Sequence, residues 1–220
     1  MFISSNFTFM AVYSLIEIDS WERFYRANLI NSLTGFKSVC LIGTINREGR
    51  SNLAIFSSIV HIGSNPPLVG YISRPLKAVP NTIANIETTG VYTINHIHPA
   101  FIERAHQTSA KYPDGISEFD EVGLTQEFVP AIAAPFVKES SVKYALELQE
   151  IIPIKLNDTF LVIGKIICIQ VEQDIISENG FLNLDKVPAV CGNGLDSYYS
   201  ASLINRYHYA KPGSNTKKIT

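Results

Sequence analysis

The chain has 220 residues, of which 46% are hydrophobic and 17% are charged, so it can bury a sizeable core and is not mainly disordered. Its 18 basic and 20 acidic residues give a net charge of −2, which lacks the basic surplus typical of nucleic-acid binding. The three cysteines are sparse, odd in number and without a CxxC pair, which argues against a disulfide framework.

The N-terminal region has no basic stretch and no cleavage site typical of a secretory signal. The longest strongly apolar run, 160–171, contains Lys165 and is too short to span a bilayer. We therefore expect a cytoplasmic protein without membrane contact. Residues 1–19 are interpreted as an N-terminal extension that either adds an edge strand or covers the core.

The first regular element predicted is a helix over 20–34. Asp19 and Glu22 have the spacing of a capping box, and apolar residues recur at helical spacing up to Leu33. Gly35 suits the C′ position, where a left-handed backbone conformation ends many helices.

Strands dominate the rest of the sequence. Runs rich in β-branched and apolar residues, separated by turn-forming residues, predict strands at 38–45, 51–61, 68–73, 90–96, 141–152 and 159–173. The remaining predictions are a short helix at 82–87 capped by Asn81, a helix at 99–110 and a loop at 111–122. Many short strands with few helices predict a mainly β protein with a closed or partly open barrel. We predict one domain, 1–212, followed by a flexible tail, 213–220.

Polar residues interrupt the apolar strands between residues 43 and 95. Asn52, Ser57 and Ser58 stand in a run that is otherwise apolar. Taken alone, this pattern fits a strand edge that faces water as well as it fits a binding site.

Arg74 and the start of the next predicted helix favour the binding site. Arg74 follows the strand at 68–73, and Asn81 and Thr82 stand where a helix begins. Helix N-termini attract anions because their first N–H groups are unpaired, and Arg is a forked cationic donor for phosphate oxygens. The combination predicts a phosphate site. The sequence has neither GxGxxG nor GxxxxGK[ST], so we expect neither a Rossmann nor a P-loop phosphate site.

The order and spacing of these residues resemble the flavin reductase-like family of FMN-binding split-barrel proteins. The block GTINREGRSNLAIFSSIVHIGSNPPLVGYISRP, followed by NTIANI and YTIN, is similar to the family pattern of a Thr-ending strand, a Gly turn, N-x-a-x-x-S, PPL, a basic residue and T-x-x-N-I. The segments FDEVGLT, PFVKESSVKYALEL, TFLVIGKIICIQV and FLNLDKVPAV extend the resemblance over 20–212. It implies an FMN-binding split β-barrel with Greek-key-like antiparallel strands.

The resemblance also implies which residues hold a noncovalent FMN. The isoalloxazine ring would be lined, partly through backbone N–H and C=O groups, by Asn52, Leu53, Ala54, Ile55 and Phe56. The phosphate would be held by Ser57, Ser58, Arg74 and Thr82, with Asn81 beside it at the helix start. Lys37 stands where relatives often carry a basic residue, and we expect it to reach the cofactor.

The activity that the resemblance implies is an FMN-dependent oxidoreductase. Electrons would pass from NADH or NADPH, or from another small-molecule or protein donor, through FMN to an acceptor, in a homodimer with the flavin near the interface. Because the flavin carries the redox chemistry, no acid–base dyad is required, and we assign no catalytic residue. His96 and His98 have no evident third ligand, so no metal site is predicted. The roles of these histidines and of Cys191 stay open.

Three alternatives remain at this stage. A non-enzymatic FMN carrier or redox-sensing module would have the same binding residues without a nicotinamide reaction. A pyridoxamine-phosphate-oxidase-like protein would use the related barrel on another substrate. A structural dimer that has lost its cofactor would retain the fold alone.

Overall fold

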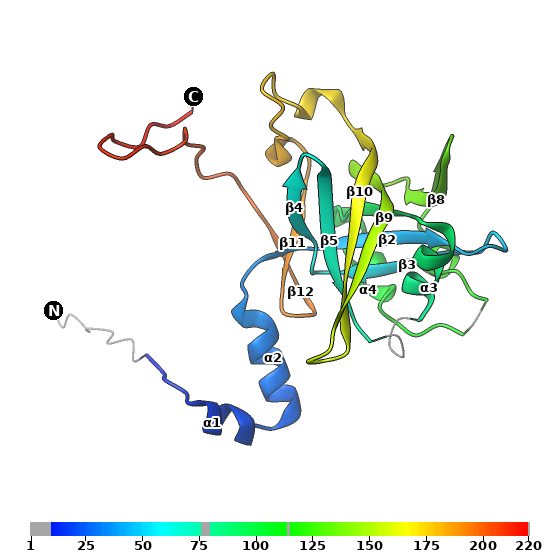
Figure 1. The fold of residues 1–220 in the computed structure, drawn as a ribbon, viewed down its shortest axis with the longest axis horizontal. Helices are drawn as coiled ribbons and strands as arrows, with labels where there is room; N and C mark the ends of the chain where they lie inside the picture. Colours follow the sequence, from blue (N-terminus) through cyan, green and yellow to red (C-terminus); the bar gives the residue numbers. More distant parts are fainter. Residues whose placement is uncertain (1–9, 76–79, 114, 220) are drawn as a thin grey trace.

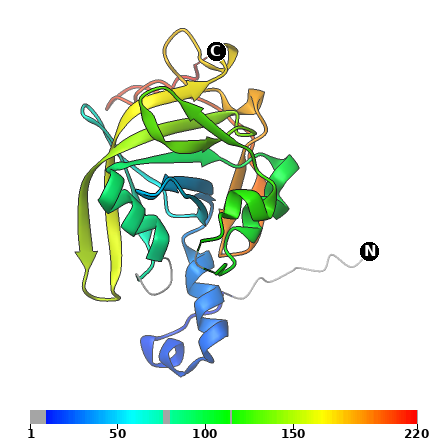
Figure 2. The ribbon, with the colours of Figure 1, turned by 90° about the vertical axis from the view of Figure 1, so that its right-hand side faces the viewer.

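The computed structural model describes residues 10–75, 80–113 and 115–219. Its centre is a seven-stranded antiparallel sheet that curls around the core (Figures 1 and 2), in the order β3-β2-β6-β9-β10-β5-β4. Its strands are β2 Cys40–Ile45, β3 Ser51–Phe56, β4 Val60–Ser64, β5 Pro67–Ser73, β6 Val91–His96, β9 Val142–Ile154 and β10 Thr159–Val171. The prediction of a mainly β, antiparallel protein is confirmed.

Two smaller antiparallel sheets and several helices complete the fold. One sheet joins β1 Lys37–Ser38, β11 Val190–Asn193 and β12 Ser197–Ser200, and the other joins β7 Gln126–Val129 and β8 Ile132–Val137. The α-helices are α1 Leu15–Ser20, α2 Arg23–Leu33, α3 Pro80–Thr89, α4 Ile102–Gln107 and α5 Glu118–Val122. The short 3₁₀ helices are η1 Pro99–Phe101, η2 Gln173–Ile175 and η3 Leu184–Lys186. No helix within the described ranges is long and apolar enough to cross a membrane.

The two edges of the large sheet are joined by a short connection. β3 ends at Phe56 and β4 begins at Val60, so the single strand predicted over 51–61 is wrong. At the break, the Ser58 hydroxyl bonds both backbone groups of Ile72 on β5. Since β3 and β4 lie at opposite ends of the strand order, so short a link requires the sheet to curl.

Apolar residues fill both faces of β2 and β3. Ile42 on β2 packs with Tyr71 and Tyr92 in one core cluster, inside the curled sheet. Leu41, the next residue of β2, packs with Phe119 in a second cluster formed with α4 and α5. Because both faces of these strands are covered, their sequences read as nearly continuous apolar runs.

The N-terminal helix prediction is corrected in its boundaries and its cap. The structure has two helices in place of one, and the capping box is formed by Ser14 and Glu17 of α1. Glu22 instead caps α2, where its carboxylate accepts the backbone N–H groups of Phe24 and Tyr25. Gly35 does adopt the expected left-handed conformation after α2, with φ of 71°.

Two further predictions differ from the structure. The segment 111–122 is not all loop, because its last residues form α5. Helix α3 begins at Pro80, so Asn81 lies in its first turn and is not its cap. At the C-terminus, Tyr207 and Lys218 form an isolated antiparallel bridge, and the flexible tail at 213–220 stays a prediction. The extent of the domain, 1–212, stays a prediction.

Gly164 on β10 allows close packing against Tyr92. A Cβ atom at Gly164 would overlap the Tyr92 hydroxyl oxygen and lie 2.9 Å from the Cβ of Leu146. We expect Gly164→Ala to lower the free energy of unfolding by about 1–3 kcal/mol, the usual cost of overpacking a core. Urea denaturation measures this loss, and adding Tyr92→Phe to Gly164→Ala should recover part of it. A Gly164→Ala protein as stable as the parent would contradict the packing.

Candidate functional site

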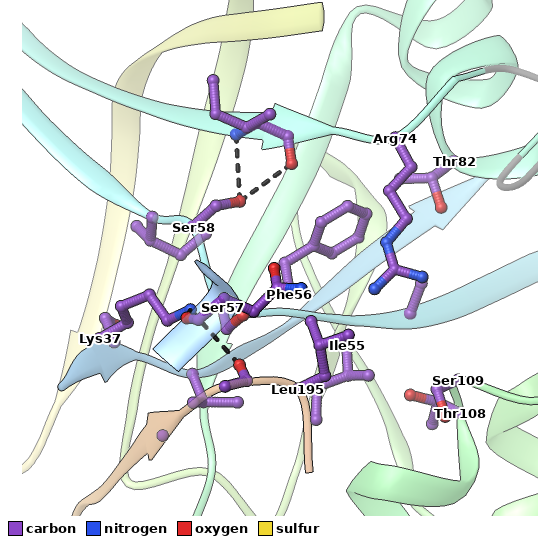
Figure 3. Close-up of a pocket in the computed structure, with 18 of the residues that line it drawn as sticks. Lys37, Ile55, Phe56, Ser57, Ser58, Arg74, Thr82, Thr108, Ser109 and Leu195 are labelled. Carbon is purple, nitrogen blue, oxygen red and sulfur yellow. Dashed lines mark hydrogen bonds between the residues drawn. The ribbon is translucent and has the colours of Figure 1, made fainter. Parts of the chain in front are cut away.

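A large open cavity of about 1310 Å³ lies beside β3 (Figure 3). Its walls come from the end of α2, from β3 and the link to β4, from the end of β5, from the start of α3 and from the β11–β12 hairpin. The predicted site residues that line it are Lys37, Asn52, Ala54, Ile55, Phe56, Ser57, Ser58, Arg74, Asn81 and Thr82. Leu53 does not, because its side chain is fully buried in the core. The fold thus brings residues from separate segments into one cavity.

The free edge of β3 faces this cavity with backbone hydrogen-bonding groups. Among the described strands β3 pairs with β2 alone, and the Leu53 N–H turns away from β2 to donate to Glu118 Oε2 at 3.0 Å. Alternate residues of an antiparallel strand direct their backbone groups to the same side. The N–H and C=O of Ile55 therefore face the same open edge as those of Leu53. Such an edge can pair with a flat heterocycle that carries its own ring N–H and C=O groups.

Arg74 places a positive charge in the cavity. It follows the last residue of β5, and its exposed side chain extends into the cavity near Thr82 (Figure 3). Within the described part of the chain no carboxylate forms an ion pair with its guanidinium. A guanidinium with free donors in a cavity is suited to a phosphate or a carboxylate.

Asn52 ties the start of β3 to the first turn of α3. Its Nδ2 donates to Thr82 Oγ1 at 3.2 Å and to Thr44 Oγ1 at 3.3 Å, and all three residues are buried. Asn85 of α3 adds a third donor bond, to Thr44 Oγ1 at 3.0 Å. Because the Thr82 hydroxyl oxygen accepts from Asn52, its own proton can be donated to a ligand at the N-terminus of α3.

The two serines after β3 differ in their hydrogen bonds. Ser58 Oγ donates to the Ile72 carbonyl at 2.9 Å and accepts the Ile72 N–H at 3.1 Å, two residues before Arg74. Its hydroxyl therefore fixes the end of β5 and, through it, the origin of the Arg74 side chain. Ser57 also lines the cavity, and its hydroxyl makes no hydrogen bond to any residue within the described ranges.

Lys37 lies across the cavity from Arg74 (Figure 3). Its Nζ donates to the carbonyl oxygens of Asn31 at 3.1 Å and Gly194 at 3.3 Å. The side chain thus joins the C-terminal end of α2 to the β11–β12 hairpin. One of its three donors remains for a ligand.

Glu118 is a cavity residue that the sequence prediction missed. It lies at the start of α5, within the segment predicted as a loop, and its carboxylate holds the edge of β3 through Leu53. Burial raises the pKa of this carboxyl, although the Leu53 N–H acts in the opposite direction. The signals that could have found the helix are Phe119 and Val122 at helical spacing before Gly123, whose φ is 67°.

The raised pKa of Glu118 predicts a pH dependence of stability. A carboxyl with a raised pKa in the folded state adds stability at low pH and loses it as pH rises through the folded pKa. We expect Glu118→Gln to keep the Leu53 hydrogen bond and to become more stable than the parent as pH rises above the usual carboxyl range. Melting temperatures of both proteins from pH 4 to 8 test this, and parallel curves would contradict it.

The histidines and Cys191 lie outside the cavity lining. His98 Nδ1 accepts the Ala100 N–H at 3.0 Å and caps a 3₁₀ turn, while burial lowers the pKa of His96. The thiol of Cys191 lies 3.6 Å from the Tyr199 carbonyl oxygen within a strand pair. In the ranges that the structure describes, no three His, Cys, Asp or Glu side chains form a group that could hold a metal ion.

Residues 36–187, which include β3, Arg74, the start of α3 and Glu118, match the model of the flavin reductase like domain. The chain belongs to the flavin reductase-like family. This places it among flavin-related oxidoreductases and confirms the resemblance found in the sequence.

Solved structures agree with the family assignment. A flavin reductase candidate with a split barrel domain from Shewanella frigidimarina is 44% identical, with a TM-score of 0.88 over 91% of this chain and 100% of that chain. The nitrilotriacetate monooxygenase component B of Bacillus cereus is 18% identical, with a TM-score of 0.77 over 89% of this chain and 98% of that chain, and shows the shared fold alone. An uncharacterised Aquifex aeolicus protein is 27% identical over 66% of this flavin reductase-like chain and 74% of its own.

Proposed function

We propose that this flavin reductase-like protein binds FMN noncovalently in the cavity beside β3 and transfers electrons from NADH or NADPH through it to an acceptor. The observation that carries the proposal is the presence, in one cavity, of the backbone edge at Ile55 and the guanidinium of Arg74, which forms no ion pair within the described ranges. A flavin ring and a phosphate group require these two kinds of partner.

The polar residues of the cavity fit the two ends of FMN. The backbone of Ile55 would bind the polar edge of the ring, and Ala54 and Phe56 add apolar wall. Arg74, Thr82 and Ser57 would bind the phosphate at the start of α3, where the helix dipole favours an anion. A Thermus thermophilus FMN-binding protein has the same fold, with 19% identity and a TM-score of 0.60.

The protein's own contribution would be binding and orientation. Bound FMN supplies the hydride acceptor. Asn52 and Ser58 keep Thr82 and the end of β5 in place, so the phosphate donors need little rearrangement when FMN binds. The Glu118 carboxyl holds the strand edge in the position required to pair with the ring.

The cofactor and the donor are tested separately. The purified protein should carry, or take up, a flavin with absorbance in the blue, and a protein that does neither would refute the FMN proposal. Anaerobic mixing with NADH and then with NADPH should bleach that band with one donor. Flavin that stays oxidised with both donors would identify a carrier, or a protein reduced by another protein.

We also propose that the protein is a homodimer with the flavin near the interface. An apolar surface on β4, β5 and β10, here called the β5 face, consists of Val60, Ile62, Ile72, Leu161 and Ile163. Val60 and Ile72 belong both to this face and to the cavity wall. A second copy on the β5 face would therefore lie beside the cavity and shield the flavin from water.

A further inference from the structure

Residues 10–33, here called the arm, contain α1 and α2. They carry large apolar side chains, none of which is buried. No residue of the arm is buried. Phe24 is 70% exposed and Leu33 68%, and the other large exposed apolar residues are Met10, Val12, Tyr13, Leu15, Ile16, Tyr25 and Ile30. Helix α1 and the start of α2 project from the barrel (Figures 1 and 2), and only the end of α2 reaches it, at the cavity wall.

A short and exposed helix such as α2 needs contacts with another surface to be stable in water. Helix α2 has eleven residues, and isolated helices shorter than about 12–15 residues are marginal in water even when their sequence is rich in Ala. Its sequence, RFYRANLINSL, has one Ala and several residues of weak helix propensity. The contacts that the arm does make are mainly internal, since Trp21 packs edge-on against Tyr13 and Tyr25 with ring centroids 5.0 and 5.2 Å apart.

The chain offers a matching surface that its own arm does not cover. On the β5 face, strand register places Val60 and Ile163 opposite Gly70, and Leu161 opposite Ile72. A Cβ atom at Gly70 would meet the methyl groups of Ile62 at 2.9 Å and Leu161 at 3.1 Å, so these two side chains close over the glycine and make the aliphatic surface continuous across the three strands. Val60 and Ile62 remain 47% and 42% exposed.

A second copy of the chain offers an apolar partner both for the arm and for the β5 face. The arm presents exposed aromatic and aliphatic side chains, and the β5 face presents a continuous aliphatic surface. A two-fold dimer gives each copy one arm and one face, so a single exchange covers both apolar surfaces in both copies. An interface built this way is apolar and extended, as interfaces of permanent homodimers are.

We infer that the arm of one copy packs on the β5 face of a second copy. Because Val60 and Ile72 belong to the face and to the cavity wall, the partner's arm then covers the side of the cavity next to β4. The inference rests on the proposed homodimer, and it names the segment that forms the dimer.

Complementation between two single variants tests this exchange. Phe24→Asp alters the arm, and Ile62→Asp alters the β5 face without changing a cavity-lining residue. Each should raise the dimer dissociation constant at least tenfold in sedimentation velocity. An equimolar mixture should recover dimers, because one arm and one face are intact in each mixed pair. Leu156→Asp, at the 98% exposed tip of the β9–β10 hairpin, is the matched control and should leave the constant unchanged.

The outcomes separate this inference from the proposed function. A monomeric parent, an unchanged dissociation constant in either variant, or a mixture that stays monomeric would overturn the arm exchange. Circular dichroism verifies that each variant is folded, and both replaced side chains are exposed enough to make folding of the monomer insensitive to them. FMN binding is measured on the same samples by absorbance. A parent that dimerises through the arm but binds no flavin would refute the proposed function and leave the arm exchange standing.

Discussion

Replacing Arg74 with Ala is expected to weaken FMN binding by about 1.5–3 kcal/mol, the scale of a hydrogen bond to a charged group. This corresponds to a roughly ten- to hundredfold higher dissociation constant. The physical reason is that the guanidinium has no carboxylate partner within the described ranges and extends into the cavity beside Thr82. Titration of the apoprotein with FMN, followed by quenching of flavin fluorescence, measures the change.

Riboflavin is the decisive control for Arg74. It has the same ring as FMN but no phosphate, so Arg74→Ala should leave riboflavin affinity nearly unchanged. Equal losses for the two ligands would mean that Arg74 acts on the ring or on the fold. Arg50→Ala provides a matched arginine control, because Arg50 is 2.8 Å from Glu48 on an exposed turn and does not line the cavity. Arg74→Lys should retain part of the affinity, since it keeps the charge without the fork.

Ile55→Pro is expected to abolish detectable flavin binding at micromolar concentrations while leaving the fold intact. Proline removes the backbone N–H, and at the free edge of β3 this N–H takes no part in the pairing with β2. The lost donor and the added ring atoms would act on FMN and riboflavin alike. Flavin titration and a thermal melt of the same sample measure the two effects.

Two variants show whether this loss comes from the strand edge. Ile55→Ala keeps the N–H and should bind FMN far better than Ile55→Pro. Ala54→Pro removes an N–H on the opposite side of the strand, which pairs with β2, and should destabilise the fold by about 1–3 kcal/mol through an unmade hydrogen bond. If Ile55→Pro unfolds the protein and Ala54→Pro does not, the assigned edge of β3 is wrong.

Local sequence patterns were sufficient to predict several elements near the site. The turn-forming residues between the predicted strands at 38–45 and 51–61 do bond one another, as when the Asn46 side chain accepts the Arg50 N–H. The helix predicted at 82–87 is also present, although it begins two residues earlier, at Pro80, and ends two residues later, at Thr89. Such features are recognisable in sequence because their partners lie within a few residues.

Glu118 and Lys37 make long-range contacts that the sequence did not predict. Glu118 lies 65 residues from its partner Leu53, and the chain gives no local sign of that contact. Lys37 was expected to reach the cofactor, but its Nζ also joins Asn31 to Gly194, which is 157 residues away in sequence. Pairings across such separations depend on how the sheet curls, which no short motif encodes.

The sequence by itself determined the family and the antiparallel β character, and ten of its eleven predicted site residues line the cavity, because a motif fixes residue types and strand ends together. Only the tertiary structure decided that β3 is an edge strand, that the Ile55 backbone faces the cavity and that most of the arm projects from the barrel. The reason is physical. The alternation of side chains along a strand can be recognised from neighbouring residues. The neighbour of each strand and the burial of each face result from contacts between distant segments.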